Sequence, residues 1–66
     1  MKIVVNGREL EVREGVTIGE LLRELKVLDQ TVAIAVNSEI VKRDQWEKYR
    51  LREGDRVEAL QFVGGG

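Results

Sequence analysis

The sequence contains neither cysteine nor histidine. Disulfide bonds, metal sites built on thiolate or imidazole ligands, and catalysis by either residue are therefore excluded. Any chemistry must use carboxylates, lysines, hydroxyl groups or the chain terminus. We expect no catalytic residue set, no bound metal and no bound cofactor.

An excess of charge of one sign is also missing. The 11 basic and 12 acidic residues leave a formal net charge of -1, which is too weak a field to gather phosphates, so we expect no nucleic-acid partner. No apolar run approaches the roughly 18 residues of a membrane span, and the charged start leads into a strand pattern without a signal-peptide core. The sequence therefore predicts a cytoplasmic protein without a membrane partner.

The length and composition indicate one small globular domain. The chain has 66 residues, of which 42% are apolar and 35% charged, a balance typical of folded proteins. We expect a domain over residues 1–63 and a flexible glycine tail over residues 64–66. With no disulfide to support so small a core, regular elements and good packing must stabilise it.

The first predicted unit is a hairpin with its reversal at Asn6-Gly7. This pair readily adopts the positive φ angles of a tight turn, and apolar residues alternate on both sides of it, at Ile3, Val5, Leu10 and Val12.

A helix is expected to begin near Thr17. Thr17 and Glu20 have the spacing of a capping box, in which each side chain binds the backbone amide of the other residue. An apolar stripe with helical spacing follows, and we expect all four of its residues to lie in the core: Ile18, Leu21, Leu22 and Leu25.

A central strand is expected after the helix, because the segment is apolar on both faces. Val32, Ile34 and Val36 share one face, whereas Ala33 and Ala35 lie on the other. The next stretch, residues 40–51, shows no clean period; we expect one short helical turn there, with Trp46 tucked beneath it.

The expected order is two strands, a helix, a strand, an irregular stretch and a final strand. The first and last strands are apolar enough to be central neighbours, and the helix-containing middle supplies the crossover that a parallel pair needs. This order predicts an α+β fold of the β-grasp, or ubiquitin-like, type, with a mixed sheet of four to five strands and one main helix.

The final strand leads into Gly64, Gly65 and Gly66. Glycines form a thread without side chains that can enter a narrow cleft, with the terminal carboxylate as the reactive group. An idle, frayed end is the alternative.

An apolar docking patch is predicted beside this tail. Leu60 and Phe62 lie on the face of the last strand opposite Val57 and Ala59, and Ala33 and Ala35 are expected to complete the patch. In the alternative interpretation, a bulge returns Leu60 and Phe62 to the core.

A series of short motifs spans the whole chain: Asn6-Gly7, residues 16–18, 32–37 and 40–43, Trp46, residues 54–58 and residues 62–66. In this order and at this length they resemble the ThiS family of small sulfur carrier proteins of thiamin biosynthesis. One departure is Lys42, where many members have proline before the basic residue.

The resemblance implies a function for the terminus. A ThiF-like adenylyltransferase would use ATP to adenylate Gly66, with Gly64 and Gly65 threaded into the partner. A persulfide donor would then displace AMP and leave a thiocarboxylate, from which a ThiG-like thiazole synthase would take the sulfur. The chain would be a recycled co-substrate and not an enzyme.

Three alternatives share parts of this prediction. The chain is also compatible with a sulfur carrier for molybdopterin synthesis or tRNA thiolation, with a ubiquitin-like modifier conjugated through Gly66, and with a simple binding module whose tail is idle.

Overall fold

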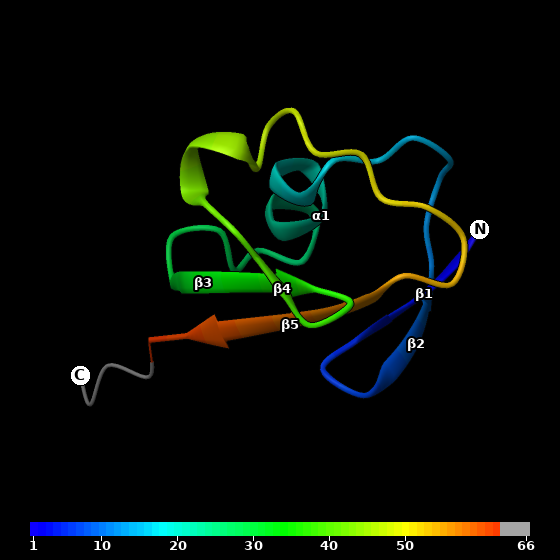
Figure 1. Ribbon diagram of the computed structural model, residues 1–66, viewed down its shortest axis with the longest axis horizontal. Coiled ribbons are helices and arrows are strands. Elements are labelled where there is room, and N and C mark those ends of the chain that lie inside the picture. The colour runs from blue at the N-terminus through cyan, green and yellow to red at the C-terminus, as the bar shows by residue number, and fades with distance from the viewer. Residues whose placement is uncertain (63–66) are drawn as a thin grey trace.

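The computed structural model describes residues 1–62. Val63 and the predicted tail, Gly64 to Gly66, lie outside these residues. Within them, one α-helix and one 3₁₀ turn accompany a five-stranded sheet (Figure 1). The elements in chain order are β1 (Lys2–Val5), β2 (Arg8–Glu11), α1 (Ile18–Glu24), β3 (Thr31–Val36), β4 (Glu39–Val41), η1 (Arg43–Gln45) and β5 (Arg56–Gln61).

The strands lie in the order β2-β1-β5-β3-β4. The first and last strands of the chain are neighbours and run parallel, and the other pairs are antiparallel. This arrangement confirms the predicted β-grasp roll with a mixed sheet. It also places β5 in the middle of the sheet, with its start between β1 and β3 and its end paired with β3.

The predicted first hairpin is confirmed, with φ of 50° at Asn6 and 83° at Gly7. The Asn6 side chain has a second role, because its Oδ1 accepts from the Ala59 amide at 2.8 Å and its Nδ2 donates to the Ala59 carbonyl at 3.1 Å. The parallel pairing of β1 with β5 reaches only to Val57. The Asn6 side chain therefore extends the contacts along β5 to Ala59, two residues beyond Val57.

The capping box at the start of α1 is present as predicted. The Glu20 amide donates to Thr17 Oγ1 at 3.1 Å, and the Thr17 amide donates to Glu20 Oε1 at 2.9 Å. The helix buries Ile18, Leu21 and Leu22. These contacts place α1 across one face of the sheet.

The prediction that Leu25 lies in the core is wrong. Leu25 is the C-cap of α1 and its side chain is 40% exposed. The helix ends at Glu24, and the chain turns away at Lys26, which has a φ of 60°. Val27 and Leu28 pack against the core beyond this turn.

The predicted inner face of β3 is correct only at Ile34 and Val36. The register with β5 shifts between Thr31 and Ala33, so that one residue of β3 is bulged. Val32 is 52% exposed as a result, and Thr31 is 1% exposed in its place. Val32 therefore contributes no core side chain.

The stretch expected to be irregular contains a second hairpin. Asn37 and Ser38 have φ angles of 51° and 71°, and β4 pairs with β3 directly after them. The short helical turn is confirmed as η1, and Trp46 beneath it is 2% exposed, with its Nε1 donating to the Val41 carbonyl at 2.8 Å.

The core lies between the sheet and α1, with the segment after η1 closing one side (Figure 1). Within residues 1–62, no helix covers the opposite face of the sheet. The buried apolar side chains come from every strand except β2, from α1 and from the connecting segments: Ile3, Val5, Val16, Ile18, Leu21, Leu22, Ile34, Val36, Val41, Trp46, Leu51 and Val57.

Two carboxylates, those of Glu20 and Glu47, make the free energy of unfolding depend on pH in the acidic range. The hydrogen bond from the Thr17 amide lowers the pKa of Glu20, and the hydrogen bonds from Arg23 lower the pKa of Glu47. A carboxylate whose pKa is lower in the folded than in the unfolded state stabilises the fold above the unfolded value of about 4.3. That stabilisation is lost as the pH falls through the folded-state pKa.

We therefore expect the urea midpoint to change little between about pH 8 and about pH 5, because no histidine is present, and to fall at lower pH. Glu20→Gln keeps a capping acceptor at this position. This variant should show a smaller fall of the urea midpoint between about pH 5 and lower pH than the wild-type chain. Glu9→Gln, at an exposed position on β2, is the control for removing one carboxylate. An equal fall of the urea midpoint at acidic pH in both variants would contradict the assignment of this pH dependence to Glu20 in the helix cap.

Candidate functional site

The candidate site lies where the chain leaves the sheet at the end of β5. Gly64, Gly65 and Gly66, the predicted site, lie outside the described residues. The last of these is Phe62, whose amide donates to the Gln30 carbonyl at 2.6 Å. The end of β5 is therefore held beside the start of β3, and Phe62 lies two residues before the first glycine of the predicted tail.

Leu60 and Phe62 are on the outer face of the sheet, as predicted, with exposed fractions of 64% and 70%. The alternative, in which a bulge on the last strand returns both to the core, is wrong. The irregularity lies on β3 at Val32, and on β5 the residue that faces the core is Val57, followed by the partly buried Ala59. β5 is thus apolar on both faces at its end.

The structure brings three of the four predicted patch residues, Ala33, Ala35 and Leu60, together across strands. Ala33 pairs with Leu60, and Ala35 pairs with Glu58 on the same strand. Ala33, Ala35 and Leu60 line one shallow depression, and Phe62 follows two residues after Leu60 on the same side of the strand. The small alanine side chains leave a hollow between the larger ones.

The sequence reasoning missed one member of this surface. Ile40 on β4 pairs with Ala35, lines the same depression and is 73% exposed. The signal was the Asn37-Ser38 reversal followed by Ile40 and Val41, which point to opposite faces of a short strand. We call Ala33, Ala35, Ile40, Leu60 and Phe62 the outer patch.

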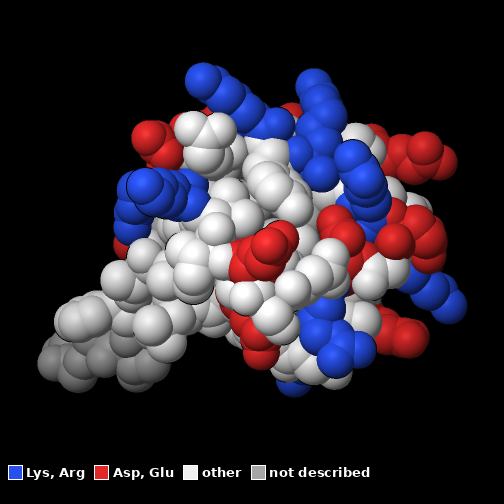
Figure 2. Space-filling model, viewed as in Figure 1, with Lys and Arg blue, Asp and Glu red and all other residues white. Residues whose placement is uncertain are grey.

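Charged side chains are spread over much of the molecular surface. Figure 2 shows uncharged surface adjoining the grey residues, while acidic and basic side chains crowd the upper and right-hand parts of the same face. An apolar centre with a polar rim is the usual anatomy of a protein interface. The outer patch is apolar, and Glu58 lines the same depression.

The carboxylates of the described residues are engaged in ion pairs or spread over the surface. Glu11 pairs with the amino terminus at 3.0 Å and Glu47 with Arg23 at 2.7 Å. Among residues 1–62, no group of three acidic side chains is placed to hold a metal ion. In the same range, none of the helices has the length and hydropathy of a membrane span.

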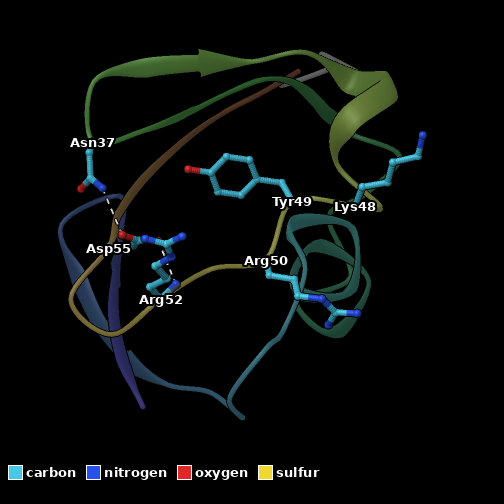
Figure 3. A pocket seen from close by; sticks show the side chains of 6 residues that line it. All are labelled: Asn37, Lys48, Tyr49, Arg50, Arg52 and Asp55. Atoms are coloured by element: carbon cyan, nitrogen blue, oxygen red, sulfur yellow. Dashed lines mark hydrogen bonds between the residues drawn. The ribbon is translucent and has the colours of Figure 1, made fainter.

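A second depression lies at the opposite end of β5. Asn37 and Asp55, which flank the start of that strand, line it together with Tyr49 and the basic residues Lys48, Arg50 and Arg52. Figure 3 shows the Tyr49 hydroxyl directed toward Asn37 and Asp55, while Lys48 and Arg50 point away from it. The basic side chains therefore do not converge on a phosphate site, and the depression lies at the end of β5 remote from Phe62.

The comparison with known proteins identifies the family. The family model described as ThiS family matches residues 1–66. The chain belongs to the ThiS family. It is 33% identical over 66 residues to the sulfur carrier protein ThiS of Escherichia coli K12, and the match covers both chains completely. ThiS proteins are sulfur carriers of thiamine biosynthesis and are not enzymes.

A solved ThiS structure has the same fold. The crystal structure of the thiamine biosynthesis protein ThiS from Geobacter metallireducens superimposes with a TM-score of 0.82, at 34% identity and with full coverage of both chains. The identity and the coverage are high enough to support a common family as well as a common fold.

Longer relatives contain a segment similar to the whole ThiS chain. A thiazole synthase of Paramagnetospirillum magneticum is 38% identical over 66 residues, and one of Magnetococcus marinus is 35% identical over the same length. The present chain spans 20% of the length of each of these two relatives.

Proposed function

We propose that the carboxylate of Gly66 is the site at which this ThiS protein carries sulfur. A terminal carboxylate has an unperturbed pKa of roughly 3.5, so at neutral pH it is an anion and a poor acyl electrophile. It must be activated before sulfur can be attached. ATP, used by a ThiF-like adenylyltransferase, would supply this activation by forming an acyl-adenylate on Gly66 with release of pyrophosphate.

A persulfide donor then supplies the sulfur. The terminal sulfur of the persulfide attacks the acyl carbon and AMP leaves, which joins the donor to Gly66 through a disulfide. A second thiol cleaves that disulfide, so that one sulfur stays on Gly66 as a thiocarboxylate and the donor side is oxidised. The carrier needs no cysteine of its own in these reaction steps, in agreement with its lack of cysteine.

We propose thiazole synthase as the protein that takes the sulfur and regenerates the carboxylate. Segments similar to this chain occur in longer relatives named thiazole synthase, and sharing a polypeptide favours contact between the two parts. The similar solved structure is named as a thiamine biosynthesis protein, which favours thiazole formation over molybdopterin synthesis, tRNA thiolation or protein conjugation. We place these steps in the cytoplasm, where ATP is supplied.

The observation that carries the proposal is the family match through Gly66, together with an exposed apolar patch at the root of the tail. Intact mass spectrometry tests it, after incubation of the chain with the adenylating enzyme, ATP and a persulfide donor. We expect a species heavier by the difference between sulfur and oxygen, with the change located on Gly66. A terminus that stays a plain carboxylate would contradict sulfur transfer.

We further propose that the outer patch docks the adenylating enzyme. Leu60→Asp places a charge at an exposed apolar position, so we expect at least tenfold weaker binding because an interface must then desolvate an unpaired carboxylate. Calorimetry measures the affinity, and circular dichroism should show a native spectrum.

Leu25→Asp is the matched control for that experiment. Leu25 is an exposed leucine on the helical side of the molecule and is more buried than Leu60, so the same change there costs at least as much stability. We expect Leu25→Asp to bind normally. Equal loss of binding in both variants, or loss of the fold in Leu60→Asp, would refute the docking role.

A further inference from the structure

Three segments distant in sequence meet where β5 ends. The Phe62 amide donates to the Gln30 carbonyl at 2.6 Å, and Gln61 Nε2 donates to Thr31 Oγ1 at 3.2 Å. The guanidinium of Arg43, from η1, donates to the Thr31 carbonyl at 2.8 Å. Phe62 is thus tied to the residue that precedes β3, Gln61 is tied to the first residue of β3, and that residue is tied to η1.

Thr31 is the centre of this network. Its side chain is 1% exposed, and its hydroxyl both donates to the Val27 carbonyl at 2.6 Å and accepts from Gln61. Thr31 also borders the bulge at Val32, where the register of β3 with β5 shifts. A bulge locally disrupts the ladder, so a charged donor to the carbonyl beside it stabilises the strand end more than a neutral donor would.

Arg43 is held in place from the core. Its guanidinium lies over the Trp46 ring, 4.9 Å from the centroid, at a distance favourable for a cation–π contact. The ring is itself buried and fixed by the hydrogen bond from its Nε1 to the Val41 carbonyl. A continuous set of contacts therefore leads from the core through Arg43 and Thr31 to Gln61.

We propose that Arg43, acting through Thr31, is a positioning residue that fixes the place and direction in which the chain leaves the sheet at Phe62. This inference rests on the proposed function. The four residues from Val63 to Gly66 span at most about 14 Å when extended. A fixed position of Phe62 limits the volume that is accessible to Gly66. Because the reacting carboxylate is then already near its reactive geometry, less entropy is lost in reaching that geometry.

The positioning role and the docking role predict different kinetics. Arg43 is not part of the outer patch, so its loss leaves docking intact but misplaces the bound terminus. For Arg43→Ala we expect kcat of the carrier-dependent exchange of ATP with pyrophosphate to fall about tenfold, with KM for the carrier nearly unchanged. Leu60→Asp should instead raise KM.

Arg50→Ala is the matched control, because the Arg50 guanidinium also donates to a backbone carbonyl, that of Gly15 at 2.8 Å, on a different part of the surface. It should leave kcat unchanged. Gln61→Ala, which removes the side-chain bond to Thr31, should lower kcat as Arg43→Ala does. Arg43→Lys keeps a charged donor and should recover part of the loss.

Amide hydrogen exchange provides a readout that does not depend on the enzyme. We expect the Phe62 amide to exchange about tenfold faster or more in Arg43→Ala, and at the wild-type rate in Arg50→Ala. Unchanged protection of Phe62, or an unchanged kcat for Arg43→Ala beside an active wild-type carrier, would overturn the positioning role. If the wild-type chain supported no exchange of ATP with pyrophosphate, the proposed function itself would fail.

Discussion

A chain shortened to end at Gly64 should accept no sulfur, although it folds as the full chain does. Its terminus is still a glycine carboxylate, so the chemistry of activation is the same. Its reach is shorter by about 7 Å, because each extended residue spans at most about 3.3–3.6 Å. The carboxylate would then stop short of the ATP bound by the adenylating enzyme.

The experiment compares intact masses after incubation with the adenylating enzyme, ATP and a persulfide donor. The Gly65→Ala variant keeps the length of the tail and adds one methyl group. It therefore distinguishes an effect of tail length from an effect of the width of the adenylating enzyme's cleft. Thermal unfolding of the shortened chain should match that of the full chain. If the shortened chain still supported thiazole formation, the tail would be idle and the protein a simple binding module.

Ile34→Ala should come close to unfolding the protein. Ile34 is fully buried in β3, between the pairings with β4 and β5, and truncation of a buried isoleucine costs about 2–5 kcal/mol. The free energy of unfolding of a 66-residue domain is roughly 3–10 kcal/mol. The loss is therefore a large part of the total, and urea unfolding followed by circular dichroism measures it.

Ile40→Ala is the same substitution at an exposed position of the neighbouring strand. Its cost in stability should be within about 0.5 kcal/mol. Because Ile40 belongs to the outer patch, the same variant should weaken docking of the adenylating enzyme. A cost as large as that of Ile34→Ala would mean that the outer patch is part of the core and not a free surface.

Much of the fold is predictable because its signals are local. The Asn6-Gly7 reversal and the Thr17–Glu20 capping box each depend on residues within one turn of chain, and both are found as predicted. The parallel pairing of the first and last strands also follows from sequence, because both strands are apolar and a long crossover joins them.

The errors arise where distant segments decide the outcome. Leu25 continues the apolar stripe of the helix in the sequence, yet the helix ends before it and the chain turns at Lys26, so that the Leu25 side chain is exposed. Val32 fits the alternation of β3, yet the register with β5 places Thr31 inward. β4 was overlooked because three residues are too few to show a period, and only pairing with β3 defines the strand.

The sequence alone determined which chemistry is open to this protein. The absence of cysteine and histidine excludes thiolate and imidazole chemistry and leaves carboxylates, lysines, hydroxyl groups and the terminus, since these are properties of residue types and do not depend on the fold. The tertiary structure decided which surface accompanies that terminus. Ile40 joins the outer patch, and Arg43 reaches Thr31 beside Gln61, because strand register and the bulge bring together side chains that no local pattern relates.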